Sequence, residues 1–414
     1  MGAKDEFEFL NSPLWLEYTQ KRYVAPDEIR HRLNQKGLSV RKWNETAQKI
    51  LVNRKVGAVP LFLKCIAKNF WYFPSDTIIR KLSDIESLGR RLFALISKQS
   101  SFATDFLLDS TIEEAITSAI YEGAHTTRAQ AQQLIASGNR PKNKDEWMLV
   151  NNLNAMKWVH ENMQQPLSEP TILSIHKIVT ENTMEGDNVN FTGKYRNDKA
   201  FIANHEGVEH GKIQVCVREM IEQATHNSRY IHPLVQGILI HYFVGYIHPF
   251  FDGNGRTARA LFYFNSMKNN LDYVQLLSVS AYLKGHGKRY ERTFEKAVEW
   301  DLDVTYFIDF CLDSIFSALN TVEEKVNYLL KITALREREN LTANQVGLLQ
   351  RLALHKFRKV SIEDYAQQIS MSREIARQEL KSLAEKKFLE EEVQGKKFMY
   401  GINRSRLQEA LKAS

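Results

Sequence analysis

The sequence predicts a mainly α-helical protein with more than one domain. Apolar residues recur at helical spacing along most of the 414 residues, and patterns typical of strands occur in only two places, near 201–215 and 388–401. A chain of this length is long enough for two or three domains. We expect a mostly helical N-terminal region, a helical core, a charged connecting helix and a small C-terminal domain, at residues 1–84, 85–320, 321–341 and 342–414.

The composition is that of an ordinary soluble protein, with 43% hydrophobic and 25% charged residues. The most apolar segment, Leu234 to Phe251, contains Gln236, His241 and His248, so we interpret it as a buried helix and a loop, not a membrane span. The N-terminus lacks the basic and apolar pattern of a secretion signal. We therefore expect a cytoplasmic protein that is not attached to a membrane.

The three cysteines, Cys65, Cys216 and Cys311, lie far apart and form no CxxC pair. This spacing argues against a disulfide framework and against a structural zinc site. It fits a protein of the reducing cytosol.

The N-terminal region carries helical stretches at Asp27–Leu33 and Trp43–Val52. Its aromatic residues indicate a small core or a docking face, and no chemistry can be assigned to it. These residues are Trp15, Trp43, Phe62, Phe70, Trp71 and Phe73.

The strongest candidate site is the segment from His248 to Arg259, HPFFDGNGRTAR, between two apolar helical patterns. Glycines at 253 and 255 allow the backbone to approach a ligand closely, and successive N–H groups at a helix start can bind an anion. Arginines three residues apart share one helix face and suit phosphate oxygens.

Two further side chains of this segment add chemistry. Asp252 offers oxygen ligands for Mg²⁺, and His248 can take a proton from a hydroxyl group. Each residue alone is more often structural, because single histidines, Gly-Asn-Gly turns and arginines are common. No fold needs all of them in one turn for stability, so the set together favours a phosphate-handling site.

This segment matches the Fic family signature HPFxDGNGRxxR at every fixed position. The resemblance implies a helical-bundle core in which a histidine deprotonates a target hydroxyl, which then attacks the α-phosphate of ATP. It implies His248 as the base and Asp252 as the Mg²⁺ ligand. It further implies that Asn254 and the backbone of Gly253 and Gly255 form an anion hole. Arg256 and Arg259 would hold the phosphates, with Arg256 nearest the γ-phosphate.

Position 255 separates two activities within this superfamily. Doc-type kinases, which phosphorylate their targets, typically carry lysine there, and this chain has glycine. The resemblance therefore favours AMP transfer to a Ser, Thr or Tyr hydroxyl of a protein, which could be the chain itself.

A second motif, Ser118 to Gly123 (SAIYEG), fits the family's inhibitory pattern [S/T]xxxE[G/N]. It lies ahead of the active site, as in the class whose inhibitory helix forms the front of the domain. The resemblance implies that Ser118, Glu122 and Gly123 form this element. It also implies that Glu122 pairs with Arg256 and keeps it from the γ-phosphate.

The resemblance covers roughly residues 85 to 320. Phe191 to Arg196 looks like the family's GxYR lead-in to a β-hairpin flap, which holds the target segment by strand addition. We expect its strands at 201–203 and 213–215. Tyr282, Tyr290 and Phe294 resemble the family's aromatic positions near the adenine. Relatives often have a second aromatic residue next to the position of Tyr290, where this chain has Glu291.

The C-terminal domain has fourteen Lys and Arg residues against nine Asp and Glu from Leu341 to Ser414. Helices are expected at 345–353, 362–369 and 373–386, with a hairpin around 394–397, in the order of a winged helix-turn-helix. Some Fic proteins carry such a module. Its recognition helix would present Arg373, Arg377 and Lys381 to DNA, and a dimerisation or interaction module remains an open alternative.

Two other enzyme classes are excluded by spacing. A P-loop ATPase needs a lysine after its glycines, which Gly255-Arg256-Thr257 lacks. A zinc protease needs HExxH, and the histidines of 205–210 lack that spacing.

Two functional alternatives stay open: removal of AMP by the same site, or a DNA-binding regulator with weak catalysis. The expected partners are ATP, Mg²⁺, a hydroxyl-bearing protein target and a second copy of the chain.

Overall fold

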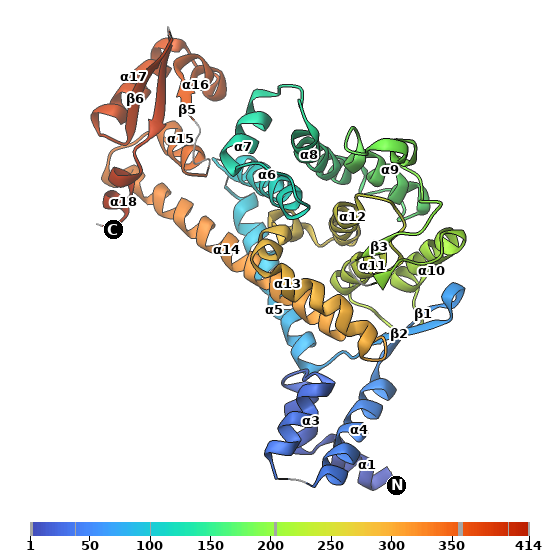
Figure 1. The fold of residues 1–414 in the computed structure, drawn as a ribbon. Coiled ribbons are helices and arrows are strands. Elements are labelled where there is room, and N and C mark those ends of the chain that lie inside the picture. Colours follow the sequence, from blue (N-terminus) through green and yellow to red (C-terminus); the bar gives the residue numbers. More distant parts are fainter. Residues whose placement is uncertain are drawn as a thin grey trace. The chain divides into compact units, whose positions relative to one another are not determined.

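The computed structural model describes residues 3–37, 39–99, 101–202, 205–354, 359–395 and 397–412, and it is mostly helical (Figure 1). Among the described residues no helix is both long and apolar enough to span a membrane. The helices are α1 (Ala3–Leu10), α2 (Pro13–Trp15), α3 (Pro26–Gln35), α4 (Val40–Gly57), α5 (Asp76–Ser97), α6 (Ala103–Tyr121), α7 (Arg128–Ser137), α8 (Lys144–Asn162), α9 (Glu169–Thr180), α10 (Ile213–Thr225), α11 (Pro233–Ile247), α12 (Asn254–Lys268), α13 (Val279–Glu299), α14 (Thr305–Arg338), α15 (Ala343–Leu354), α16 (Ile362–Ile369), α17 (Arg373–Glu385) and α18 (Arg404–Lys412).

The strands form three small antiparallel sheets. The first two are hairpins, and the third has the order β5-β7-β6. The strands are β1 (Val59–Leu63), β2 (Lys68–Tyr72), β3 (Phe201–Ile202), β4 (His205–Glu206), β5 (Lys359–Ser361), β6 (Leu389–Gln394) and β7 (Lys397–Ile402).

The chain divides into two compact units. The first contains residues 1–88, 114–274 and 278–318, and the second contains 89–113, 275–277 and 319–414. The domain boundaries expected from the sequence stay predictions. The connecting helix expected at 321–341 is the second half of α14, a single helix of 34 residues that ends at Arg338.

The core of the first unit is built around α11 and α12. Helix α11 is apolar nearly all round and is buried along almost its whole length, as its sequence predicts. It packs along α12, while α10 covers α11, and α8 and α9 pack against α12 (Figure 1). The side chains of Asn143 and Ser168 cap the starts of α8 and α9.

A buried polar network holds the N-terminal residues together and joins them to the segment before α14. The fully buried Arg54 donates to the backbone carbonyls of Tyr18 and Val24. The hydroxyl of Tyr23 donates to Asp303 Oδ2 at 2.6 Å, and burial raises the pKa of this carboxyl to about 6. The expected helices are present as α3 and α4, and the β1–β2 hairpin was not expected.

The flap differs from the sequence prediction in its second strand. Strands β3 and β4 are two residues each, with Phe201 opposite Glu206, and Ala203 lies outside the described residues. The prediction of a strand at 213–215 is wrong, because Ile213 begins α10. Its buried side chains recur at helical spacing through Met220, a pattern that three residues alone cannot reveal.

The second unit contains the elements expected of a winged helix-turn-helix, in the expected order. Helices α16 and α17 lie where they were predicted, and Ser361 and Ser372 cap them. The hairpin β6–β7 follows, with Val393 opposite Phe398. Strand β5 was not predicted, and it pairs with β7 as the third strand of the sheet.

The expectation of a chain without disulfides is wrong. Cys65, in the turn between β1 and β2, is bonded to Cys216 on α10, with their Cα atoms 5.9 Å apart. Cys311 is free and buried. The sequence hides this pair because its members are 151 residues apart, and only the packing of α10 against the first hairpin brings them together.

Thiol counting tests this disulfide. Protein purified without reductant and then denatured should take up one alkyl group, at Cys311, and three after reduction. Since the bond closes a loop of 151 residues, Cys65→Ser with Cys216→Ser should lower the free energy of unfolding by about 2–4 kcal/mol. Three alkyl groups without reduction would contradict the assignment.

Candidate active site

The segment from His248 to Gly253 is the connection between the two buried helices α11 and α12. His248 caps the end of α11 with a left-handed backbone (φ 50°), and its N–H donates to Val244 O at 3.0 Å. Gly253 caps the start of α12 with φ 78°. A left-handed conformation is uncommon for histidine, so neighbouring contacts must hold it.

Arg196 supplies those contacts. Its Nε donates to the carbonyl of His248 at 2.7 Å, and its Nη2 donates to the carbonyl of Val208 just after the flap. Its Nη1 donates to Asp198 O at 2.5 Å, and its own N–H donates to Pro249 O at 3.0 Å. One buried guanidinium thus joins the flap to the backbone of His248. In the sequence, Arg196 is recognisable only as the last residue of the GxYR motif.

Gly207 makes this close approach sterically feasible. A Cβ there would lie 2.8 Å from Arg196 Nη2 and 3.0 Å from His248 Cβ. The sequence gives no sign that a glycine is required at position 207, because the requirement arises only from tertiary packing.

Asn254 closes the loop. Its Nδ2 donates to Phe250 O at 2.8 Å, and its Oδ1 accepts from the N–H of Phe250 at 3.0 Å. The side-chain amide therefore shapes the loop. The N–H groups at the start of α12 lack acceptors within the helix, and the predicted anion site would use them.

Asp252 and Arg256 lie side by side. Asp252 Oδ1 accepts from the N–H of Gly253 at 2.6 Å, and Oδ2 lies 3.2 Å from Arg256 Nη2. The Asp252 side chain is 44% exposed, whereas that of Arg256 is 1% exposed and donates to Val179 O at 2.6 Å. Arg256 is therefore anchored to the end of α9.

The predicted pairing of Glu122 with Arg256 is wrong, because Glu122 pairs with Arg259. Arg259 Nη2 lies 2.8 Å from Glu122 Oε1, and its Nε donates to Ser118 Oγ at 2.9 Å. Both arginines lie on one face of α12, so their spacing could not decide the partner. In three dimensions one guanidinium points to α9 and the other to the end of α6.

Gly123 ends the segment that carries Glu122. Gly123 lies two residues after the end of α6 and has a φ of 94°, and the N–H of Ala124 donates to Ala119 O at 3.0 Å. Glycine is the usual residue for this left-handed helix end. The predicted inhibitory motif thus lies at a sharp helix end beside Arg259.

A second carboxylate on α6 fixes this helix to the start of α13. Glu114 lies on the same helix face as Ser118 and Glu122, and it accepts from the N–H of Ser280 at 3.0 Å and its hydroxyl at 2.6 Å. Burial raises the pKa of Glu114, while the hydrogen bonds from Ser280 oppose that rise.

A histidine behind the loop was also missed by the sequence analysis. His176 on α9 is fully buried, and its ring stacks on Phe250 with 3.6 Å between centroids. Burial lowers the pKa of this imidazole to about 4, so it is neutral near pH 7.

The donor set fits a cation that arrives with its own ligands. No cluster of three or more metal-ligating side chains occurs in the described part of the chain. Asp252 offers one exposed carboxylate beside the N-terminus of α12. Mg²⁺ commonly binds through one or two carboxylates, with phosphate oxygens and water completing its shell.

Part of this chain matches a known protein family. Residues 166–265 match the Fic/DOC family. This chain carries a Fic/DOC domain. The protein adenylyltransferase Fic of Drosophila willistoni is 27% identical over 191 residues, which are 42% of this chain and 37% of that protein. Its counterpart in Drosophila melanogaster is 28% identical over 196 residues, 43% and 38% of the two chains.

The chain thus spans well under half the length of these relatives. A crystal structure of a Fic family protein from Desulfovibrio desulfuricans superposes with a TM-score of 0.54 at 18% identity. The match covers 80% of this chain and 98% of that one, and it shows that the two share a fold.

The two tyrosines expected near the adenine lie on α13, which follows the residues that match the Fic/DOC family. Tyr282 stacks on His286, with ring centroids 4.0 Å apart. The Tyr290 hydroxyl lies 2.8 Å from His241 Nε2, and its ring packs against Phe294. Tyr290 is therefore a packing residue in this structure, and an adenine contact by either tyrosine stays a prediction.

The three basic residues expected to contact DNA belong to α17 in the second unit. Arg373 pairs with Glu363, and the neighbouring β6 exposes three glutamates, at 390–392. DNA contact by Arg373, Arg377 and Lys381 stays a prediction from the sequence.

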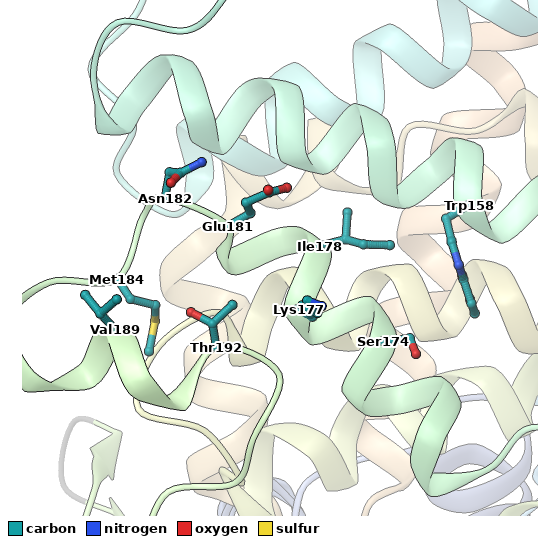
Figure 2. A pocket seen from close by; sticks show the side chains of 9 residues that line it. All are labelled: Trp158, Ser174, Lys177, Ile178, Glu181, Asn182, Met184, Val189 and Thr192. Atoms are coloured by element: carbon teal, nitrogen blue, oxygen red, sulfur yellow. The ribbon is translucent and has the colours of Figure 1, made fainter.

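A hollow of about 820 Å³ lies along α9 of the Fic domain (Figure 2). It uses the face of α9 opposite His176, since Ser174, Lys177 and Ile178 project there. It is therefore separate from the loop. The lining residues are Trp158, Ser174, Lys177, Ile178, Glu181, Asn182, Met184, Val189 and Thr192.

A double-mutant cycle tests the position of Glu122. A Cβ at residue 255 would lie far inside contact distance of Glu122 Oε1. Gly255→Ala should therefore destabilise the wild-type protein by roughly 1–2 kcal/mol. In a Glu122→Gly background the same change should stabilise by about 0.5–1 kcal/mol, because alanine suits a helix better than glycine.

Urea unfolding of the four proteins gives the coupling. Equal effects of Gly255→Ala in the two backgrounds would show that Glu122 does not lie over residue 255.

Proposed function

We propose that this chain is a protein adenylyltransferase, which transfers AMP from ATP to a Ser, Thr or Tyr hydroxyl of a protein and is restrained by Glu122. One observation carries the proposal. The carboxylate of Glu122 lies on Arg259, directly beside a complete HPFxDGNGRxxR loop. The names of the Drosophila relatives support the same reaction.

The residues of the loop suit this chemistry. His248 accepts the proton of the target hydroxyl as its oxygen attacks the α-phosphorus of ATP. The bond between that phosphorus and the bridging oxygen breaks, and pyrophosphate leaves with the electron pair. The N–H groups at the start of α12 stabilise the charge that develops on the phosphate oxygens.

Asp252 would hold Mg²⁺ together with the phosphates, and the ion would neutralise negative charge on them. Arg256 keeps the Asp252 carboxylate in place, since it is itself anchored to α9. Arg259 is the arginine that Glu122 withholds. When Glu122 leaves, the guanidinium of Arg259 needs a new acceptor, and the γ-phosphate supplies one.

Gly255 supports AMP transfer over phosphorylation. Doc-type kinases typically carry lysine at this position, and any side chain here would meet Glu122. A glycine at 255 and an inhibitory glutamate at 122 are thus mutually compatible, whereas a lysine at 255 and this glutamate are not.

Intact-mass analysis after incubation with ATP and Mg²⁺ tests the proposal, with self-modification as the signal. Glu122→Gly should raise AMP incorporation at least tenfold, because it frees Arg259, and adding His248→Ala should abolish the gain. Glu161→Gly, at an exposed glutamate near the end of α8, is the matched control and should behave as wild type.

Absence of any AMP adduct on the Glu122→Gly protein would contradict the transferase proposal. Loss of AMP from a pre-modified protein, dependent on Glu122, would instead assign removal of AMP to the same site.

A further inference from the structure

His176 makes two hydrogen bonds to segments that the proposed reaction uses. One ring nitrogen, Nε2, lies 3.0 Å from the carbonyl oxygen of Asp252. The other, Nδ1, accepts from the N–H of Gly193 at 3.1 Å, in the lead-in to Arg196. The proposed reaction assigns no role to His176.

The hydrogen-bond partners fix the tautomer. A backbone N–H can only donate, so Nδ1 accepts from Gly193. The proton of the neutral ring is then on Nε2, which donates to the Asp252 carbonyl. The ring lies parallel to Phe250, at 4°, and cannot turn without losing both hydrogen bonds and this stack.

The end of α9 therefore holds the loop at two points. His176 binds the backbone of Asp252, and one turn later the carbonyl of Val179 accepts from Arg256, whose other Nη lies beside the Asp252 carboxylate. Thr180 Oγ1 closes the same turn by donating to His176 O at 2.6 Å. Backbone and side chain of Asp252 are thus both fixed from one rigid helix.

We propose that His176 is a positioning residue for the divalent cation, which aims the Asp252 carboxylate by holding the Asp252 carbonyl and by joining this end of the loop to the Gly193–Arg196 segment. The presence of a divalent cation comes from the proposed function, and the inference rests on that function. An apolar side chain could fill the same space, but it would leave the Gly193 N–H and the Asp252 carbonyl without these hydrogen bonds.

Two substitutions separate the two hydrogen bonds. In His176→Gln the side-chain amide N–H reaches about as far as Nε2 and keeps the Asp252 bond. In His176→Asn the amide oxygen takes the place of Nδ1, so the Gly193 bond stays and the Asp252 bond is lost. His160→Asn, the same change on α8 away from the loop, is the matched control.

The first readout is Mn²⁺ binding, followed by electron paramagnetic resonance, in the presence of α,β-methylene-ATP, which cannot donate AMP. His176→Asn should weaken Mn²⁺ binding about tenfold, as loss of a group that orients a metal ligand does. His176→Gln and His160→Asn should stay within about threefold of wild type. If the Asn protein does not fold, His176→Met, which has similar length and neither hydrogen bond, should show the tenfold loss.

The second readout is AMP transfer in the Glu122→Gly background. His176→Asn should raise the Mg²⁺ concentration for half-maximal rate about tenfold, and saturating Mg²⁺ should restore most of kcat. Unchanged Mn²⁺ affinity with only a lower melting temperature would assign His176 to packing and overturn the inference. If the Glu122→Gly parent transfers no AMP, the proposed function fails, while the Mn²⁺ titration still decides the role of His176.

Discussion

The site depends on one buried guanidinium, that of Arg259, and on the groups that accept its hydrogen bonds. The Arg259 side chain is 3% exposed, and a guanidinium removed from water must find anionic or polar partners nearby. In this structure they are Glu122 and Ser118, both at the end of α6. In the proposed function a nucleotide phosphate exchanges with this carboxylate on Arg259. A nucleotide phosphate is an acceptor of the same sign and similar geometry.

The rest of the Fic domain keeps the loop ready for that exchange. Arg196 holds the left-handed backbone of His248, Asn254 closes the loop on Phe250, and α9 fixes Asp252 through His176. These contacts come from segments before and after the flap, and none of them involves Glu122. Removing Glu122 should therefore change access to Arg259 and leave the remaining geometry in place, which is the arrangement that a reversible restraint requires.

The sequence predicted the helical class and the loop between two buried helices, because each is a local pattern, and the inhibitory role of the segment that ends at Glu122 stays a prediction. It failed where the outcome depends on packing. Arg256 and Arg259 share a helix face, so only the positions of α6 and α9 assign Glu122 to Arg259. The Cys65–Cys216 bond and His176 join residues that are distant in the chain. The second flap strand was a misjudged helix start, where two apolar residues, Ile213 and Val215, flank a polar one and fit both patterns.

The most direct measurement compares ATP with ADP binding, by calorimetry, to His248→Ala and to Glu122→Gly/His248→Ala, neither of which can turn over. With Glu122 on Arg259, the γ-phosphate should add little, and the two nucleotides should bind within about threefold of each other. Without Glu122, ATP should bind at least tenfold more tightly than ADP, since a freed guanidinium gains a charged hydrogen bond of about 1.5–3 kcal/mol. The same ATP-to-ADP ratio in both proteins would contradict the claim that Glu122 withholds Arg259 from the nucleotide.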